Sequence, residues 1–234
     1  MNSSVVAAEV ARFDALATRW WDPRGPMAPL HAMNPLRVGW VDQHVRAAHG
    51  RAATLLDIGC GAGLAAEALA RLGHDVTGID AATEVINAAR AHAEGQDLPL
   101  RYRNATAEQL LEEGARFEAV TALEVIEHVA DPAAFLHTLA GLLAPGGVLV
   151  LSTLNRTRRS YLTAKIGAEY VLRLLPVGTH SWAQFITPPE LAAMVRAAGL
   201  RVADLAGMGF NPLTGRWRMT QDMAVNYILA ARKD

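Results

Sequence analysis

An apolar segment that runs into a glycine-rich turn constrains the fold of this chain more than any other feature. Residues 55–63 read L-L-D-I-G-C-G-A-G, and a helical pattern follows from Leu64 to Leu72. Glycine at the first, third and fifth positions of the turn permits a sharp bend and a close approach of a ligand to the backbone, because no Cβ stands in the way. A strand, a glycine turn and a helix in this order are typical of α/β folds that bind nucleotides.

A second acid follows at the spacing expected of a nucleotide site. Asp80 ends a strand-like run from His74 to Ile79 and lies 21 residues beyond Gly59. A carboxylate at the end of the second strand can accept hydrogen bonds from both hydroxyls of a ribose. The sequence therefore predicts that the chain binds an adenosine-containing cofactor.

The spacing of the glycines indicates which cofactor this is. The dinucleotide fingerprint G-x-G-x-x-G needs its third glycine where this chain has Leu64, which counts against NAD. Asp57 precedes Gly59 by two residues, at a strand tip where its charge would repel a pyrophosphate. Such an acid suits a cofactor that carries an ammonium and a sulfonium. From about Ala52 to its end the chain resembles the S-adenosylmethionine-dependent class I methyltransferases, and a purely structural turn is the alternative.

The composition limits the range of partners. The chain has 234 residues, half of them apolar, which is enough for one large α/β domain. Its net charge of −1 offers no electrostatic footprint for nucleic acid. Cys60 is the only cysteine, so we expect no disulfide framework and a reducing compartment. The sequence has neither a signal-peptide pattern nor a run of about 18 apolar residues, and we therefore expect a cytoplasmic protein.

Strand and helix patterns alternate along the chain without a long linker or an internal repeat. This alternation predicts a doubly wound, mostly parallel, Rossmann-like sheet of seven strands. A helix should begin at Asp131 and Pro132, an N-cap followed by proline. Another should run from Pro188 to Ala198, because Thr187 and Glu190 form a capping box. The predicted strands are 54–58, 75–80, 100–103, 117–122, 147–153, 200–205 and 224–231.

We expect a single methyltransferase domain over residues 1–234, made of four segments. Residues 1–50 mix aromatic anchors with prolines and should fold over the domain as an N-terminal helical cap. Residues 51–154 form the cofactor-binding half, and residues 187–234 form a C-terminal helix and hairpin. The segment 155–186 is a helical insert after the fifth strand, and inserts of this length are usually functional. Substrate selection is the expected role of the cap and the insert.

Several strings are similar to the ubiquinone-biosynthesis O-methyltransferases, from Phe13 through Tyr227. They read F-D-A-L-A-T-R-W-W-D, P-L-H-A-M-N-P-L-R, L-D-I-G-C-G-A-G, E-V-I-E-H-V, S-T-L-N-R, G-A-E-Y-V-L-R, G-T-H and F-I-T-P-P-E-L, in this order. The resemblance implies methyl transfer to phenol or catechol oxygens of polyprenylated ring intermediates, at two steps of ubiquinone synthesis. It also implies that the last two strands form a hairpin in which the final strand is antiparallel.

The resemblance also assigns part of the cofactor site. It implies that Arg37 binds the methionine carboxylate of S-adenosylmethionine, a pairing for which a guanidinium fork is suited. Leu123 would approach the ligand through its backbone. From the residues themselves, we expect Asp80 at the ribose and Gly59 against the methionine and ribose portion. The predicted cofactor-binding residues are Arg37, Asp57, Gly59, Gly61, Asp80 and Leu123.

The chemistry needs a base, because a phenol with a pKa of about 10 is mostly neutral at pH 7. Glu124, Glu127 and His128 would share one face if the segment after the fourth strand were helical. Such a set can act as a base, with His128 and Glu127 as catalytic residues, or hold a divalent cation. The resemblance implies the second role, a magnesium ion bound by all three, and both roles stay open. His180 in the insert is a further candidate for the base.

Other functions remain open from the sequence. An RNA or DNA methyltransferase would share the fold, but the amino-methylating types carry an N/D-P-P-Y/F string where this chain reads L-E-V-I-E-H. A non-catalytic lipid-handling or scaffold protein of ubiquinone assembly is an alternative, as is a small-molecule methyltransferase with another substrate.

The insert predicts contact with a membrane. Residues 161–176 place Lys165, Glu169 and Arg173 on one helical face and apolar side chains on another. A basic, amphipathic helix can rest in the headgroup region of an anionic bilayer, and a lid over the active site is the alternative. Other ubiquinone-biosynthesis proteins are expected partners.

Overall fold

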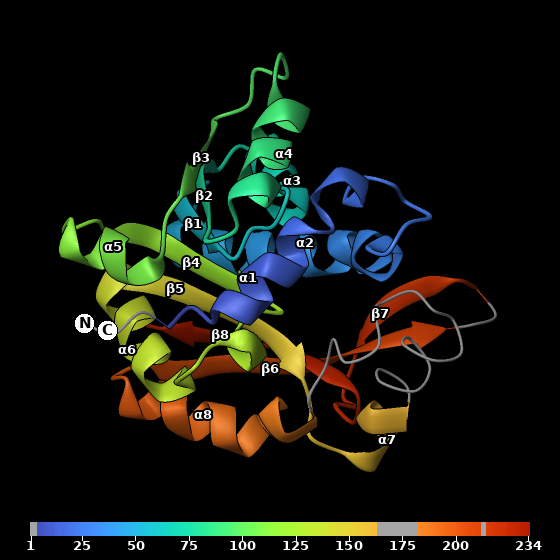
Figure 1. Ribbon diagram of the computed structural model, residues 1–234. Helices are drawn as coiled ribbons and strands as arrows, with labels where there is room; N and C mark the ends of the chain where they lie inside the picture. Colours follow the sequence, from blue (N-terminus) through green and yellow to red (C-terminus); the bar gives the residue numbers. More distant parts are fainter. Residues whose placement is uncertain (1–3, 163–181, 212–213) are drawn as a thin grey trace.

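The computed structural model describes residues 4–162, 182–211 and 214–234. Within them the chain forms one mixed sheet of eight strands in the spatial order β3-β2-β1-β4-β5-β8-β6-β7 (Figure 1). The strands are β1 (Thr54–Ile58), β2 (Asp75–Asp80), β3 (Leu100–Asn104), β4 (Phe117–Leu123), β5 (Leu143–Leu154), β6 (Arg201–Asn211), β7 (Arg216–Thr220) and β8 (Asn226–Arg232). Strands β1 to β5 are parallel, and β8 lies antiparallel between β5 and β6.

Helices cover both faces of the sheet (Figure 1). They are α1 (Ala7–Asp14), α2 (Ala28–His49), α3 (Leu64–Arg71), α4 (Thr83–Ala93), α5 (Ala107–Glu112), α6 (Pro132–Leu142), α7 (Arg158–Ser160) and α8 (Pro188–Ala197), with 3-10 turns η1 (Ala17–Arg19), η2 (Ile126–His128) and η4 (Trp182–Gln184). Buried side chains of α5, α6 and α8 pack on one face, and those of α2, α3 and α4 pack on the other.

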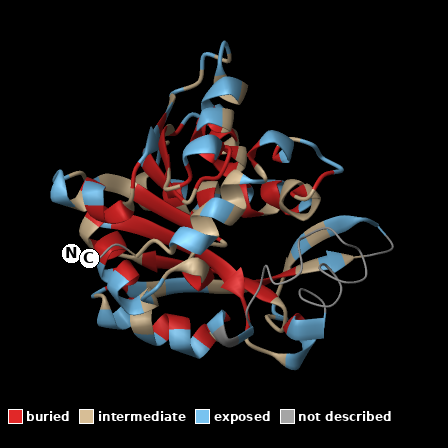
Figure 2. Cartoon of the chain, in the orientation of Figure 1, coloured by how far each residue is buried: buried red, intermediate tan, exposed pale blue. Residues whose placement is uncertain are grey.

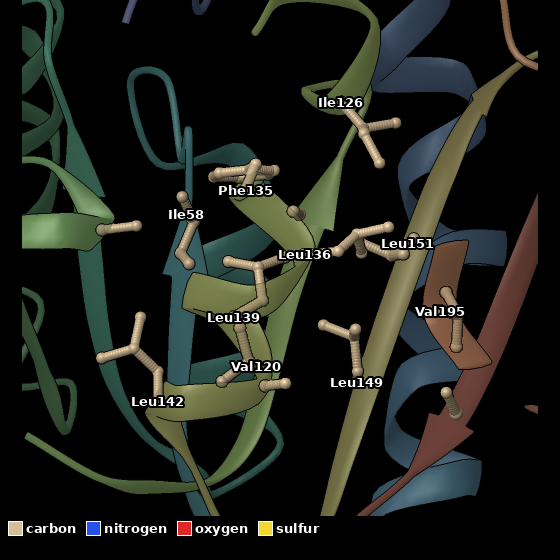
Figure 3. Packing of buried hydrophobic residues seen from close by; sticks show 14 of the residues in the cluster. Ile58, Val120, Ile126, Phe135, Leu136, Leu139, Leu142, Leu149, Leu151 and Val195 are labelled. Carbon is tan, nitrogen blue, oxygen red and sulfur yellow. The ribbon is translucent and has the colours of Figure 1, made fainter. Parts of the chain in front are cut away.

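Neighbouring residues of the central strands point to opposite faces, so the sheet has a core on each side. Leu55 packs with α2, α3 and α4, whereas Leu56 packs with α5, α6 and α8, and both side chains are fully buried. Burial on both faces explains why these strands read as continuous apolar runs, and they appear as the red interior of Figure 2. In Figure 3, Leu136 of α6 lies among Val120 of β4 and Leu149 of β5.

The predicted doubly wound arrangement is confirmed, and β1 and β2 have the predicted bounds. The predicted number of seven strands is wrong, because β7 had no counterpart among the predicted strands. Its sequence R-W-R-M-T alternates charged and apolar residues over only five positions, too short a run to stand out beside the buried strands. β8 is antiparallel to both of its neighbours, as the resemblance implied, but the implied hairpin with the preceding predicted strand is wrong, because β7 lies between β6 and β8 in the chain.

Both predicted helix starts are confirmed. The Asp131 side chain caps α6, because its Oδ1 accepts hydrogen bonds from the amides of Ala133 and Ala134, each at 3.0 Å. Helix α8 follows Thr187, whose amide donates to the Glu190 carboxylate at 2.9 Å. The capping residues therefore set where these two helices begin.

The N-terminal residues cover the glycine turn. The Trp21 indole donates from Nε1 to the Ala62 carbonyl at 3.0 Å and stacks on His92 of α4, with ring centroids 3.4 Å apart. Asp14 of α1 accepts a hydrogen bond from the Glu84 amide at 2.9 Å, at the start of α4. Three side-chain contacts, one to the glycine turn and two to α4, thus hold this segment against the carboxyl ends of β1 and β2.

Most of the predicted amphipathic helix at 161–176, together with His180, lies outside the described residues. Among the residues that the structure does describe, no helix combines the length and the apolar character needed to cross a membrane.

Candidate active site

A cavity of about 970 Å³ opens at the carboxyl ends of β1, β2 and β4. These strands meet where the strand order reverses, because β1 pairs with β2 on one side and with β4 on the other. Such a switch point is where α/β sheets bind ligands. Gly59, Asp80 and Leu123 line the cavity from the strand ends, and residues of α1 and the start of α2 also line it.

The glycine turn leaves no room for side chains. Gly59 has a φ of 63°, and a Cβ there would lie 2.5 Å from Cγ2 of Val125. Gly61 has a φ of 55°, and a Cβ there would lie 2.2 Å from the ring of Trp20. Left-handed backbone and close packing both exclude any larger residue.

Asp80 lies at the end of β2 with both carboxylate oxygens held by backbone amides. Oδ2 accepts from the Gly61 amide at 3.0 Å, and Oδ1 accepts from the Ala82 amide at 2.9 Å. Burial raises the pKa of Asp80, and these amides oppose that rise. Each carboxylate oxygen can accept two hydrogen bonds, so Asp80 can still bind a hydroxyl in the cavity that it lines.

Asp57 and Arg37 are buried charges close to this end of the sheet, although neither lines the cavity. Asp57 Oδ1 accepts from the Thr121 hydroxyl at 2.7 Å, and burial raises the pKa of Asp57 to about 6. Burial lowers the pKa of Arg37, and nearby carboxylates oppose this effect. Asp57 Oδ2 and Arg37 Nε have no hydrogen-bond partner among the described residues. Since unpaired buried polar atoms are costly, a ligand that supplied partners would stabilise them. Together with Asp80, they form the polar end of the site.

The helix that would place Glu124, Glu127 and His128 on one face does not form. Glu124 has left-handed backbone with a φ of 60°, and only the single 3-10 turn η2 follows it. A left-handed residue cannot continue an α-helix, so the spacing in sequence no longer places these side chains one above another.

Each of the two acids has its own hydroxyl partner on β5. Glu124 Oε1 accepts from the Ser152 hydroxyl at 2.7 Å, and Glu127 Oε2 accepts from the Thr153 hydroxyl at 2.8 Å. Burial, with a smaller contribution from the Glu124 charge, raises the pKa of Glu127 to about 7. Glu124 and His128 line the cavity, whereas Glu127 does not.

The described residues do not form a magnesium site. They contain no group of three or more His, Cys, Asp or Glu side chains arranged to hold a metal ion. Magnesium demands near-octahedral oxygen ligands, whereas here both carboxylates bind hydroxyls of β5 and the third side chain is an imidazole. As arranged, these side chains do not fit the ion.

Helix α1 holds His128 at the cavity. The Nδ1 atom of His128 lies 2.9 Å from Oε2 of Glu9, an ion-pair distance, and the Phe13 ring meets the imidazole edge-on at 5.6 Å between centroids. A carboxylate beside Nδ1 favours the proton on that nitrogen, so that Nε2 carries the lone pair of the neutral imidazole. Neither Glu9 nor Phe13 was a predicted site residue, and the only signal for this region was the string that starts at Phe13.

The wall of the cavity becomes apolar toward the last strands. Here its wall contains Met208 and Phe210 of β6 and Trp217 of β7, and these three residues form the apolar end of the site. Met27 and Met33 from the start of α2 line the cavity as well. One cavity therefore connects a charged region at β2 with an apolar region at β7.

Comparison with known proteins identifies the class. A family model described as a methyltransferase domain matches residues 36–205. The structure of magnesium protoporphyrin IX methyltransferase from Synechocystis PCC 6803 with bound SAM has a TM-score of 0.63 at 18% identity and covers 100% of both chains. A SAM-dependent methyltransferase from Aquifex aeolicus has a TM-score of 0.65 at 15% identity, over 94% of this chain and 98% of that one. Fold and site thus define a class I methyltransferase that uses S-adenosylmethionine.

Curated relatives narrow the class to one family. The ubiquinone biosynthesis O-methyltransferase of Azorhizobium caulinodans is 48% identical over 99% of this chain and 95% of its own length. The protein of the same name from Caulobacter sp. (strain K31) is 50% identical over 99% of this chain and 96% of its own. The chain belongs to the ubiquinone biosynthesis O-methyltransferase family and is an S-adenosylmethionine-dependent O-methyltransferase.

Proposed function

We propose that this enzyme moves a methyl group from S-adenosylmethionine to phenol and catechol hydroxyls of polyprenylated ubiquinone precursors. The observation that carries the proposal is one cavity with a polar end at β2 and an apolar end at β6 and β7. The polar end suits the charged cofactor, and the apolar end suits the isoprenoid substituent of an acceptor ring. The name of the relatives supports the same substrate class.

The proposed cofactor contacts follow from the polar end. We assign Asp80 to the ribose hydroxyls, because its carboxylate lines the cavity with spare lone pairs. Arg37 does not line the cavity, and we assign it to the methionine carboxylate because its buried Nε has no partner among the described residues and would gain most from an anionic one. Asp57 balances the positive charge of the cofactor, which supplies an activated methyl group on its sulfonium. Backbone contacts are assigned to Gly59 and Leu123, which line the cavity, whereas a contact with Gly61, whose amide donates to Asp80, stays a prediction.

His128 is the proposed general base. It lines the cavity, and with Nδ1 at 2.9 Å from the Glu9 carboxylate the imidazole is oriented to take the proton of the substrate hydroxyl through Nε2. The oxygen then forms its bond to the methyl carbon in line, and the electron pair of the broken carbon–sulfur bond stays on sulfur. The protein contributes position and exclusion of water. Glu127 is the less favoured base, because a base must reach the substrate hydroxyl itself, whereas Glu127 does not line the cavity and accepts a hydrogen bond from Thr153.

A magnesium requirement stays a prediction of the resemblance. The arrangement of Glu124, Glu127 and His128 does not fit the ion, and no step of the proposed mechanism uses it. Assays in excess chelator test the prediction, since turnover that stops with chelator and returns with magnesium would favour an ion.

Isotope transfer tests the proposed function. The purified protein is incubated with methyl-labelled S-adenosylmethionine and a short-chain demethylubiquinol, and the product is analysed for the label. We expect the methyl group on oxygen. Cofactor binding measured by calorimetry separates this enzyme from a non-catalytic scaffold, which should show no heat.

Contact with an anionic membrane and with other ubiquinone-biosynthesis proteins also stays a prediction. It rests on the sequence of 161–176 alone, since most of that segment is outside the described residues. Sedimentation with anionic liposomes at low salt tests the membrane part, and a protein that stays in the supernatant would contradict it.

A further inference from the structure

The hairpin of β6 and β7 extends past the rest of the sheet. Pairing between β6 and β8 ends at Gly207 opposite Tyr227. Residues 208–211 of β6 pair only with β7 among the described strands. Figure 1 shows β7 and the end of β6 projecting away from the strands that carry the polar end. This part of the sheet is therefore an extension of the cavity wall rather than part of the core.

Apolar side chains form a row on one face of this hairpin. Met208 and Phe210 are two residues apart on β6 and so lie on the same face. Met219 and Trp217 are their partners on β7, and the rings of Phe210 and Trp217 are 5.5 Å apart at 50°. Phe210 is 52% exposed, a large aromatic side chain that the protein itself leaves half uncovered. Aromatic groups gain most when such surface is buried.

The apolar row is continuous with the reaction site. Phe210 and Trp217 line the same cavity as Gly59 and Asp80, so a molecule can occupy both ends at once. The row also meets the start of α2, because Met33 and Met208 belong to one buried cluster against which Trp217 packs.

The charged side chains that line the cavity near the hairpin do not weaken binding of an apolar ligand. Arg159 and Asp222 are bonded to each other at 2.6 Å, and both are exposed, as is Arg218. Exposed charges of this kind keep their hydration when an apolar ligand lies beside them.

We propose that the isoprenoid tail of the substrate leaves the reaction site along this row, and that Phe210 and Trp217 determine the preference for tailed over tail-less substrates. The inference rests on the proposed function, because it assumes that the acceptor ring carries a polyprenyl chain. A ring held near His128 has its reacting hydroxyl toward the polar end, and its apolar substituent follows the cavity to the hairpin. The row then supplies affinity for the tail without touching the reacting atoms.

The test compares one catechol with and without a tetraprenyl tail, using the full chain. We expect the parent to favour the tailed substrate in kcat/KM. Phe210→Asp places a charge in the row and should reduce that preference at least tenfold, while kcat/KM for the tail-less catechol stays within about twofold. Phe210→Leu should keep most of the preference. Leu72→Asp is the matched control, because Leu72 is also a large exposed side chain, at 41%, and does not line the cavity.

Several results would overturn the inference. They are a parent without preference for the tail, equal losses for both substrates in Phe210→Asp, and the same loss in Leu72→Asp. A Phe210→Asp variant that no longer sediments with anionic vesicles but keeps its preference would make the row a bilayer contact instead.

Binding separates this inference from the proposed function. Calorimetry with tetraprenylphenol and with phenol measures how much the tail adds to binding affinity, without turnover. If no catechol is methylated but tetraprenylphenol binds at least tenfold more tightly to the parent than to Phe210→Asp, the methyl transfer proposal fails and the tail site stands. If methyl transfer occurs and this difference in binding is absent, the tail site fails alone.

Discussion

The two ends of the cavity differ in the burial and the charge of the side chains that form them. At the polar end, Asp57 and Arg37 are buried charges with atoms left unpaired, and Asp80 is held in place by two backbone amides. At the apolar end, Phe210 is half exposed and its ring lies 5.5 Å from the ring of Trp217. The polar end is thus prepared for a ligand before it arrives, at a cost to the stability of the free protein. The apolar end offers exposed apolar surface to a ligand, and its side chains can move at little cost in stability.

This difference separates two kinds of recognition. Buried charges with fixed geometry select one charged ligand and reject analogues that leave them unpaired. An exposed apolar row accepts any chain of sufficient length, because the gain follows the area that is buried. Substitutions at the polar end should therefore change binding of the cofactor, and substitutions at the apolar end should change the preference for a tailed substrate.

The largest effect is expected where the two ends meet, at His128. His128→Ala should lower turnover by about 10²- to 10⁴-fold, because it removes the transfer of the substrate proton. Binding of S-adenosylhomocysteine should not change, since His128 is not part of the polar end. Activity should recover in part at high pH, where the phenol ionises unaided. His137→Ala on the exposed face of α6 is the control, and an equal loss there would mean that the effect is not specific.

Asp57→Asn should stabilise the free protein at neutral pH. The pKa of Asp57 is raised to about 6 in the folded state by burial, so the folded protein binds this proton more tightly than the unfolded chain. The stability contributed by the neutral form is complete below pH of about 4 and is lost as pH rises through about 6. Near pH 7.5 the variant should exceed the parent by about 2–3 kcal/mol in free energy of unfolding, and the two should converge near pH 4. Urea unfolding across this range measures the difference, and parallel curves would contradict the assignment.

Asp80→Ala should weaken binding of S-adenosylhomocysteine at least tenfold, a loss of roughly 1.5–3 kcal/mol, because two ribose hydroxyls lose their charged acceptor. Calorimetry measures this directly. Asp75→Ala is a matched control at the other end of β2, where the carboxylate makes only an exposed ion pair with Arg101. Unchanged affinity in Asp80→Ala would remove Asp80 from the cofactor site.

The smallest effect on stability is expected at the apolar end. Phe210→Ser should lower the free energy of unfolding by less than about 1 kcal/mol, the range of a cross-strand aromatic pair, because half of the Phe210 side chain is already in water. Thermal unfolding beside Leu72→Ser would show whether the loss exceeds that of another exposed apolar residue. A loss of several kcal/mol would mean that the hairpin belongs to the core and would break the contrast between the two ends.

The two acids of the polar end were accessible from the sequence because local signals mark them, whereas Arg37 was assigned from the family resemblance. Asp57 and Asp80 each stand at the tip of a strand, and tips of neighbouring parallel strands meet at one edge of the sheet. Capping signals at Asp131 and Thr187 are equally local, and both helices begin where these residues predicted. Patterns of this kind need no knowledge of what packs against them.

The other features of the site depend on tertiary structure and could not be predicted from the sequence. The helical face of Glu124, Glu127 and His128 assumed regular backbone, but Glu124 is left-handed, which no sequence pattern around an acid indicates. Glu9 reaches His128 from α1, more than a hundred residues earlier in the chain, and no spacing rule connects two such positions. Strand β7 is short and contains no fully buried residue, so it lacks the apolar run that marked the other strands.

The position of β8 has a consequence for how the chain assembles during synthesis. β8 follows β6 and β7 in the sequence, yet it is the strand that joins them to β5. When the ribosome has made β6 and β7, the five parallel strands can already pack as a unit, but the hairpin lacks the strand that joins it to β5. The edge of β5 and the outer edge of β6 therefore both stay unpaired until β8 is made.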